Sequence, residues 1–313
     1  MEILRTPDDR FAALQAEGPD GFRYEPHYVE IPVDESTGGQ QLRMAYVEEG
    51  PAHGPVVLLL HGEPTWSYLY RSMLPVLAAR GLRAVALDLI GFGRSDKPAR
   101  TDDHSYARHV EWVRAAVVDA LDLREVTLVC QDWGGLIGLR LAMENPDRFA
   151  AIVAANTGLP TGDHPMPDIW WAFRTAVETA PTLDVGRLVA SGCKRGLSDA
   201  ARAAYDAPFP DESFKAGPRA MPLILPTAPD DPATEPNRAA WQRLSTWDKP
   251  FLVAFSDSDP ITGPMAPVLT RAVPTAANRP QPVVANAGHF LQEDAGEELA
   301  VTVADFLARE VPN

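Results

Sequence analysis

The segment QDWGG at residues 131–135 separates two apolar stretches and constrains the fold more than any other part of the chain. Residues 126–130 before it are apolar and partly β-branched, which predicts a strand, and residues 136–142 after it have a helix-forming composition. A strand that passes directly into a helix needs a sharp turn with small neighbours, here Cys130 and Gly134, and this turn lifts one side chain off the carboxyl end of the sheet. Asp132 is that side chain, and a carboxylate placed there can attack carbon and form an ester. The alternative is an aspartate that only caps the following helix.

Composition limits the classes of protein to consider. With 313 residues and 45% apolar content, the chain is long enough for one large α/β domain with an insertion, or for two domains. A net charge of −15 argues against nucleic-acid and anionic-membrane partners. Two cysteines, Cys130 and Cys193, predict no disulfide framework. No apolar run predicts a membrane span, and the acidic, proline-containing N-terminus does not resemble a signal peptide, so we expect a cytoplasmic protein.

Short apolar runs alternate with helical patterns, which predicts a mostly parallel central sheet with helices on both faces. A segment rich in proline and tryptophan interrupts this alternation over residues 157–247 and shows helical patterns only. We therefore expect a core domain of residues 1–156 and 248–313, with a helical cap of residues 157–247 over the carboxyl ends of the strands. The predicted strands are 28–33, 42–49, 55–61, 83–87, 126–130, 149–156, 250–255 and 281–285, with a turn at 35–39. The predicted helices are 68–80, 107–121, 136–142, 168–179, 186–191, 199–205, 264–272 and 293–309.

Three further segments place polar residues in loops that follow predicted strands. In HGEPTW at 61–66, the backbone amide of Glu63 is a candidate to join that of Trp133 in stabilising an oxyanion, unless the segment is an ordinary turn. In SDSDP at 256–260, either aspartate can orient a histidine or merely shape the turn before the proline, and we favour Asp259 over Asp257.

The third of these segments contains His289, which follows the last predicted strand. The chain order is then Asp132, Asp259, His289. This is the nucleophile, acid, histidine order of α/β-hydrolases, so we expect His289 to be catalytic rather than structural.

Five segments carry a resemblance to a known family: HGEPTWSYLYR (61–71), DLIGFGRSDKP (88–98), VCQDWGGLIGLRLA (129–142), YDAPFPDESFKAG (205–217) and AGHFLQED (287–294). They resemble the haloalkane dehalogenases, specifically the first subfamily, which have an α/β-hydrolase fold. The likeness extends from about residue 1 to residue 309 and includes the cap.

The resemblance implies a role for each candidate residue. It implies Asp132 as nucleophile, His289 as base, Asp259 as acid, and Trp133 as a halide-binding indole, with the amide of Glu63 as the second oxyanion donor. The implied partners are a small halogenated substrate, halide ion and water, with no cofactor or metal. The oligomeric state is not implied.

One departure from the family pattern concerns the cap. The family has a second halide-binding tryptophan there, but an alignment without gaps places Phe173, which has no N–H group, at that position. Trp170 and Trp171 come just before it, and neighbouring helix residues point about 100° apart, so at most one of them faces the pocket. We favour Trp171 as the donor with Phe173 as an apolar wall, the alternative being a site with a single indole donor.

Three other functions share this fold. An epoxide hydrolase needs acidic phenols from the cap, and the cap offers only Tyr205. A haloacid dehalogenase needs cationic anchors, for which Arg174 and Arg195 are candidates. A non-catalytic ligand receptor is the alternative from another class, because fold does not fix function.

Overall fold

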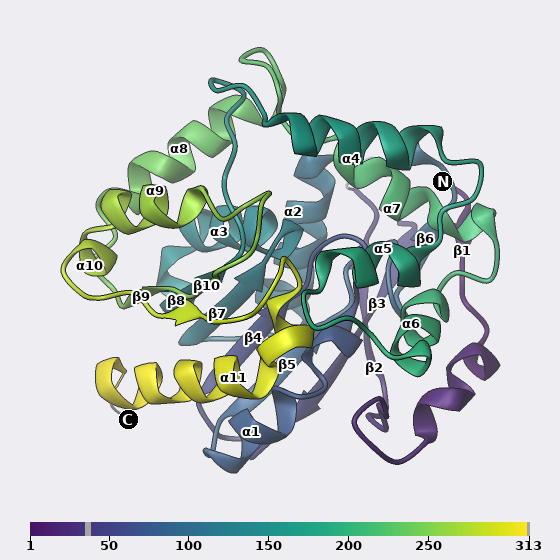
Figure 1. Cartoon of the computed structure of the whole chain (residues 1–313), viewed down its shortest axis with the longest axis horizontal. Helices are drawn as coiled ribbons and strands as arrows, with labels where there is room; N and C mark the ends of the chain where they lie inside the picture. The colour runs from purple at the N-terminus through teal and green to yellow at the C-terminus, as the bar shows by residue number, and fades with distance from the viewer. Residues whose placement is uncertain (35–38, 312–313) are drawn as a thin grey trace.

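A seven-stranded sheet forms the centre of the molecule in the computed structural model, which describes residues 1–34 and 39–311 (Figure 1). Its order is β2-β3-β5-β4-β7-β8-β9; β3 is antiparallel to both of its neighbours, β2 and β5, and the remaining pairs are parallel. The mostly parallel sheet is therefore confirmed, whereas most of the predicted turn at 35–39 lies outside the described residues. The strands are β2 (His27–Pro32), β3 (Gln41–Glu49), β4 (Val56–Leu60), β5 (Arg83–Leu87), β7 (Val126–Gln131), β8 (Phe149–Ala155) and β9 (Phe251–Val253).

Two short strand pairs accompany the sheet. β10 (Phe255–Ser256) and β11 (Val283–Val284) are parallel, and β1 (Ile3–Leu4) and β6 (Lys97–Pro98) are antiparallel. The predicted strand over 250–255 is thus divided between β9 and β10.

The register of the central strands brings the polar segments together. Leu60 pairs with Cys130, and Gln131 pairs with Ala155, so β4, β7 and β8 end at the same edge of the sheet. Every residue of β7 is buried, as its continuous apolar run requires for a strand covered on both faces. The loops that begin at His61 and Asn156 are consequently neighbours of Asp132.

Helices cover both faces of the sheet (Figure 1). α1 (Leu74–Ala79) packs against α11 (Leu291–Glu310) on one face, and α2 (Tyr106–Arg114) packs against α3 (Trp133–Glu144) on the other. The predicted helix over 68–80 is two pieces, η2 (Ser67–Tyr70) and α1, because Pro75 near the start of α1 favours a new helix there. The predicted helix over 107–121 is α2 followed by the π-helical turn η4 (Ala115–Ala120).

The described elements between β8 and β9 are all helical, and we call residues 157–247 the cap. Side chains of Asp184 and Ser198 cap the first turns of α5 and α6. The sequence patterns did not predict α7 or α8, and α8 packs on α3. The helices of the cap are α4 (Asp168–Thr179), α5 (Val185–Gly192), α6 (Asp199–Asp206), η6 (Glu212–Lys215), α7 (Ala216–Ala220), η7 (Met221–Leu223) and α8 (Thr234–Leu244); α9 (Met265–Ala272) and α10 (Pro274–Ala277) follow β9 and β10.

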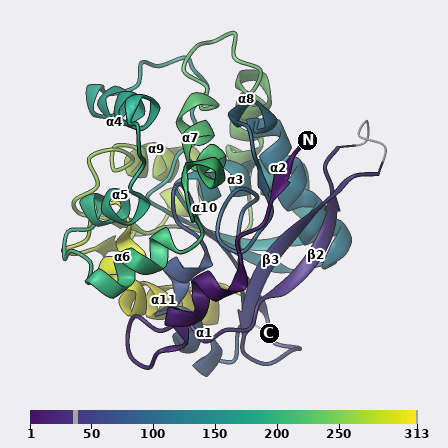
Figure 2. The ribbon, with the colours of Figure 1, turned by 90° about the vertical axis from the view of Figure 1, so that its right-hand side faces the viewer.

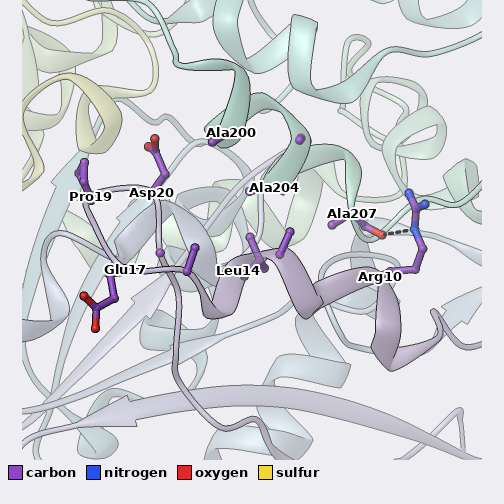
Figure 3. Close-up of a pocket in the computed structure, with 12 residues that line it drawn as sticks. Arg10, Leu14, Glu17, Pro19, Asp20, Ala200, Ala204 and Ala207 are labelled. Carbon is purple, nitrogen blue, oxygen red and sulfur yellow. Dashed lines mark hydrogen bonds between the residues drawn. The ribbon is translucent and has the colours of Figure 1, made fainter.

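The N-terminal helix η1 (Asp8–Gln15) lies along α6 of the cap (Figure 2). Between them is a pocket of about 230 Å³ with many alanines in its wall, where Arg10 donates to the carbonyl of Ala207 at 3.4 Å (Figure 3). Its lining contains the carboxylates Glu17 and Asp20 but no histidine. None of the helices in the described part of the chain is both long and apolar enough to cross a membrane.

Candidate active site

Asp132 occupies a strained turn between β7 and α3. Its φ of 51° and ψ of −128° lie where residues other than glycine are rarely found. A Cβ atom on Gly134 would lie 2.0 Å from the carbonyl oxygen of Leu60, and one on Gly62 would lie 2.2 Å from Oδ1 of Asp132. The backbone therefore packs too closely for larger residues at these positions, and the predicted sharp turn is present with Asp132 at its apex.

The two carboxylate oxygens of Asp132 have different neighbours. Oδ1 accepts a hydrogen bond from the amide of Glu63 at 2.8 Å, whereas Oδ2 lies 3.4 Å from Nε2 of His289. The backbone of Asp132 is also held, because its amide donates to the carbonyl of Asn156 at 3.0 Å and its carbonyl accepts from Thr157 Oγ1 at 2.7 Å. One carboxylate oxygen is thus bound to an amide while the other faces the imidazole.

His289 lies between the carboxylates of Asp132 and Asp259. Its Nδ1 atom is 2.9 Å from Oδ2 of Asp259, and both residues are buried. Asp259 is fixed in turn by the amides of Ile261 and Thr262, at 2.8 and 3.2 Å, and by the Thr262 hydroxyl. The structure therefore brings together the three residues predicted for the catalytic site.

Opposing effects set the protonation of this pair. Burial disfavours the imidazolium form of His289, but the carboxylates of Asp259 and Asp132 outweigh burial and raise its pKa to about 10. Burial also raises the pKa of Asp259, whereas the facing imidazole and the hydrogen bonds that Asp259 accepts lower it to about 2. Part of the raised pKa of His289 depends on the charge of Asp132.

Asp257, the other candidate for the acid, has a different role. Its carboxylate accepts hydrogen bonds from the amides of Asn286 and Ala287, at 2.8 and 3.3 Å, and from Ser258 Oγ at 2.8 Å. The two backbone donors and the hydroxyl donor lower its pKa to about 2. Asp257 therefore stabilises the loop that leads to His289 rather than the imidazole.

Three polar residues at strand ends hold His289 and its loop, and the sequence analysis missed them. Gln131 Nε2 lies 3.1 Å from Nε2 of His289 and 3.2 Å from its carbonyl oxygen. Asn156 Nδ2 donates to the carbonyl oxygens of Gly288 and His289 at 2.9 and 3.0 Å, and Ser256 Oγ donates to that of Gly288 at 2.8 Å. In the sequence, each of them is a polar residue at the end of an apolar strand or directly after it.

The side chain of Glu63 is buried next to Asp132. Its Oε1 has no hydrogen-bond partner among the described residues, and only 5% of the residue is exposed. Burial, together with the nearby charge of Asp132, raises the pKa of Glu63 well above its usual range.

Trp133 begins α3, where the first amides of a helix have no intrahelical acceptor. Its indole is 5% exposed and packs edge-on against Tyr106, with ring centroids 5.2 Å apart. The indoles of Trp66, Trp112 and Trp241 donate to backbone carbonyls, but no described residue accepts a hydrogen bond from the indole of Trp133. Its N–H group is thus available to another acceptor.

The orientation of α4 bears on the choice between the two tryptophans of the cap. The inward side of α4 consists of Trp170, Phe173, Arg174 and Val177, spaced as one helical stripe. Trp171 is 41% exposed and lies on the outer side, whereas Trp170 is 5% exposed. Burial therefore favours Trp170, and not the expected Trp171, as the indole that faces the protein interior. Phe173 is half-buried and packs against the core.

The residues proposed for the other functions have other partners. The Tyr205 hydroxyl donates to Glu293, which also binds Arg71. The Arg174 guanidinium lies over the rings of Trp170 and Trp171, and Arg195 Nε donates to the carbonyl of Asn286 at 3.3 Å.

The strand order, the strained aspartate turn and the His289–Asp259 pair define an α/β-hydrolase. The family described as "alpha/beta hydrolase fold" matches residues 55–296 of the chain. A haloalkane dehalogenase from Psychrobacter cryohalolentis is 52% identical over 98% of each chain, and one from Mycobacterium marinum is 51% identical over 96% of this chain and 98% of the relative. The solved structure of a tetrameric haloalkane dehalogenase from Paraglaciecola agarilytica matches all of both chains with a TM-score of 0.88 and 36% identity. The chain belongs to the haloalkane dehalogenase family, hydrolases that act on carbon–halogen bonds.

Proposed function

We propose that the protein hydrolyses haloalkanes to an alcohol, a halide ion and a proton through a covalent alkyl ester on Asp132. The observation that carries this proposal is the arrangement around that residue, in which Oδ1 is bound to the Glu63 amide and Oδ2 faces His289. An exposed serine or cysteine is not needed, because a carboxylate is itself a sufficient nucleophile toward an sp³ carbon.

In the first step, Asp132 attacks the halogen-bearing carbon in line with the carbon–halogen bond. The bond from oxygen to carbon forms as the bond from carbon to halogen breaks, and the halogen leaves with the electron pair. Oδ2 is the attacking atom, because Oδ1 is already bound by the Glu63 amide and becomes the ester carbonyl oxygen.

The departing halide needs hydrogen-bond donors rather than a proton. Trp133 follows the nucleophile directly and has an indole N–H without an acceptor among the described residues. An indole N–H is a donor with no lone pair to repel an anion. In the cap, the buried position of Trp170 supports this residue as the second indole donor. Phe173 then forms an apolar wall beside it.

In the second step, His289 removes a proton from water, which attacks the ester carbonyl carbon. Esterification of Asp132 removes one of the two charges that raise the pKa of His289, which favours the neutral imidazole that can act as a base at this stage. Gln131 Nε2, a donor facing His289 Nε2, favours this neutral form. Asp259 keeps the other ring nitrogen protonated and stabilises the cation that forms.

Two backbone amides stabilise the tetrahedral oxyanion. The Glu63 amide is already 2.8 Å from Oδ1 of Asp132, and the Trp133 amide at the start of α3 is the second donor. Donors fixed in position before the reaction stabilise developing charge without reorganisation, and each is worth roughly 3–4 kcal/mol in such sites.

The alternative functions receive less support. An epoxide hydrolase needs a phenol that faces the substrate, but the Tyr205 hydroxyl donates to Glu293. A haloacid dehalogenase needs a free cation, but Arg174 stacks on tryptophan rings and Arg195 binds a backbone carbonyl.

The experiment that tests the proposal measures halide release from chloro-, bromo- and iodoalkanes, beside diol formation from a panel of epoxides. We expect halide release with the purified protein and none with Asp132→Ala, which removes the nucleophile without disturbing the core. Diol formation without halide release would instead identify an epoxide hydrolase, and no turnover of either panel would favour a receptor.

A further inference from the structure

One buried carboxylate outside the triad binds both the catalytic loop and the cap. Asp294, in the first turn of α11, is 3% exposed. Its Oδ2 accepts hydrogen bonds from the amides of Gly288 and Lys194, both at 2.8 Å, and its Oδ1 accepts one from the amide of Arg195 at 2.6 Å. Gly288 precedes the catalytic histidine, whereas Lys194 and Arg195 belong to the cap.

The three residues directly before His289 each donate a backbone hydrogen bond to a carboxylate. Asp257 binds the amides of Asn286 and Ala287 from the partly exposed side of the loop. Asp294 binds the amide of Gly288 from the buried side. Of these three amides, that of Gly288, the residue next to His289, is therefore fixed by Asp294.

The cap approaches this loop too closely for an intervening side chain. A Cβ atom on Gly288 would lie 2.3 Å from the carbonyl oxygen of Gly192, and a Cβ atom on Gly192 would lie 2.7 Å from the Phe290 ring and 3.6 Å from Cβ of His289. The amide of Phe290 also points to the carbonyl of Gly192 at 3.4 Å. Because Asp294 binds both backbones at this contact, the end of α5 and the histidine loop are held as one unit.

We propose that Asp294 is a positioning residue that places His289 for hydrolysis of the ester by locking the cap turn 192–195 onto the histidine loop. This inference rests on the proposed function of His289 as the base of the second step. Asp294 acts through the histidine loop and not on the substrate. Cleavage of the carbon–halogen bond uses Asp132, which is held separately by Glu63, Asn156 and Thr157. Loss of Asp294 therefore slows the second step and spares the first.

The test uses Asp294→Asn, which keeps the shape of the side chain but places an amide group where backbone donors converge. We expect ester hydrolysis to slow about 10- to 100-fold, because small displacements of a catalytic group have effects of this size. The rate of the first halide release should stay within about threefold of the parent, a change too small to indicate a lost transition-state contact. Rapid-quench measurement of halide and mass spectrometry of the intact protein give the two rates, and the ester should accumulate.

Matched variants separate this role from a general loss of stability. Asp305→Asn, in the same helix but exposed, should behave as the parent. Gly192→Ala changes the cap side of the same contact and should likewise slow ester hydrolysis while sparing the first halide release. It replaces Asp294→Asn as the test if that variant does not fold. Equal slowing of both steps, or no accumulation of ester in either variant, overturns the inference. His289→Gln serves as the reference: if it also accumulates no ester, the proposed function itself fails, whereas accumulation only in His289→Gln refutes the role of Asp294 alone.

Discussion

Oδ2 of Asp259 lies 2.9 Å from Nδ1 of His289, and the carboxylate is further fixed by two backbone amides and a hydroxyl group. A carboxylate in this position keeps the histidine proton on Nδ1 and leaves Nε2 toward Asp132. It also stabilises the imidazolium that forms when the imidazole takes a proton from water.

We predict that Asp259→Asn is nearly inactive and that Asp257→Asn retains most activity. The loss of a triad carboxylate costs roughly 10⁴-fold in turnover, because the imidazole adopts the wrong tautomer. Asp257 binds backbone amides of the loop before His289 and the Ser258 hydroxyl but not the imidazole, so its replacement should lower kcat by no more than about tenfold. Steady-state halide release from the two variants distinguishes them. The reverse order of activities would identify Asp257, and not Asp259, as the acid.

His289→Gln should separate the two chemical steps. Because the imidazole acts only on the ester, the variant should release about one halide per active site and then stop. The intact protein should gain the mass of the alkyl group, and proteolysis should locate it on Asp132. The same modification on another residue, or continued turnover at the parental rate, contradicts the assignment of these roles.

The positions of Asp132 and His289 were predictable because each depends on local sequence. The turn at Asp132 follows from an apolar strand, a small residue on either side and a helix, and these features persist whatever surrounds them. His289 follows from its place after the last strand. The division of the helix over 68–80 was also visible in principle, since Pro75 favours a helix start.

The orientation of the cap was less predictable, because it depends on which side of α4 meets the core. Trp170 and Trp171 are adjacent, so a choice between them requires the phase of the whole helix. Trp170, Phe173 and Val177 form one inward-facing stripe, and this stripe gives the phase that places Trp170 on the inner side. An alignment of single positions does not contain this pattern. The contacts of Asp294 join segments about 100 residues apart, and no local pattern contains them.

The two adjacent tryptophans provide a matched test of halide binding. Trp170→Phe should raise the dissociation constant of bromide about tenfold or more, because a hydrogen bond to a buried anion is worth roughly 1.5–3 kcal/mol. Trp171→Phe removes an exposed ring and should titrate like the parent. Quenching of tryptophan fluorescence by bromide measures both. If Trp170→Phe also binds like the parent, Trp133 is the sole indole donor, and Phe173→Trp should then tighten binding.

Tyr205→Phe tests whether the phenol has a catalytic or a structural role. The hydroxyl belongs to a buried network with Glu293 and Arg71 that joins the cap to the core. Its removal should lower the free energy of unfolding by roughly 1–3 kcal/mol, the cost of leaving a buried polar group unsatisfied. Turnover of haloalkanes should stay within about threefold of the parent. A large loss of activity in a variant with parental stability would instead place the phenol in the reaction.

The last prediction concerns the pH dependence of stability at Glu63. A carboxyl group whose pKa is raised on folding contributes stability below its unfolded pKa, about 4.3, and this contribution is lost as pH rises toward the folded pKa. Glu63→Gln keeps the neutral shape and cannot ionise, so its free energy of unfolding should increase relative to the parent as pH rises from 5 to 8. Urea denaturation at each pH measures this difference, and the ionisable groups that the two proteins share cancel in it. Glu17→Gln, whose carboxylate is 90% exposed, should follow the parent at every pH. Parallel curves for Glu63→Gln and the parent would mean that Glu63 ionises as freely in the folded protein as in the unfolded chain.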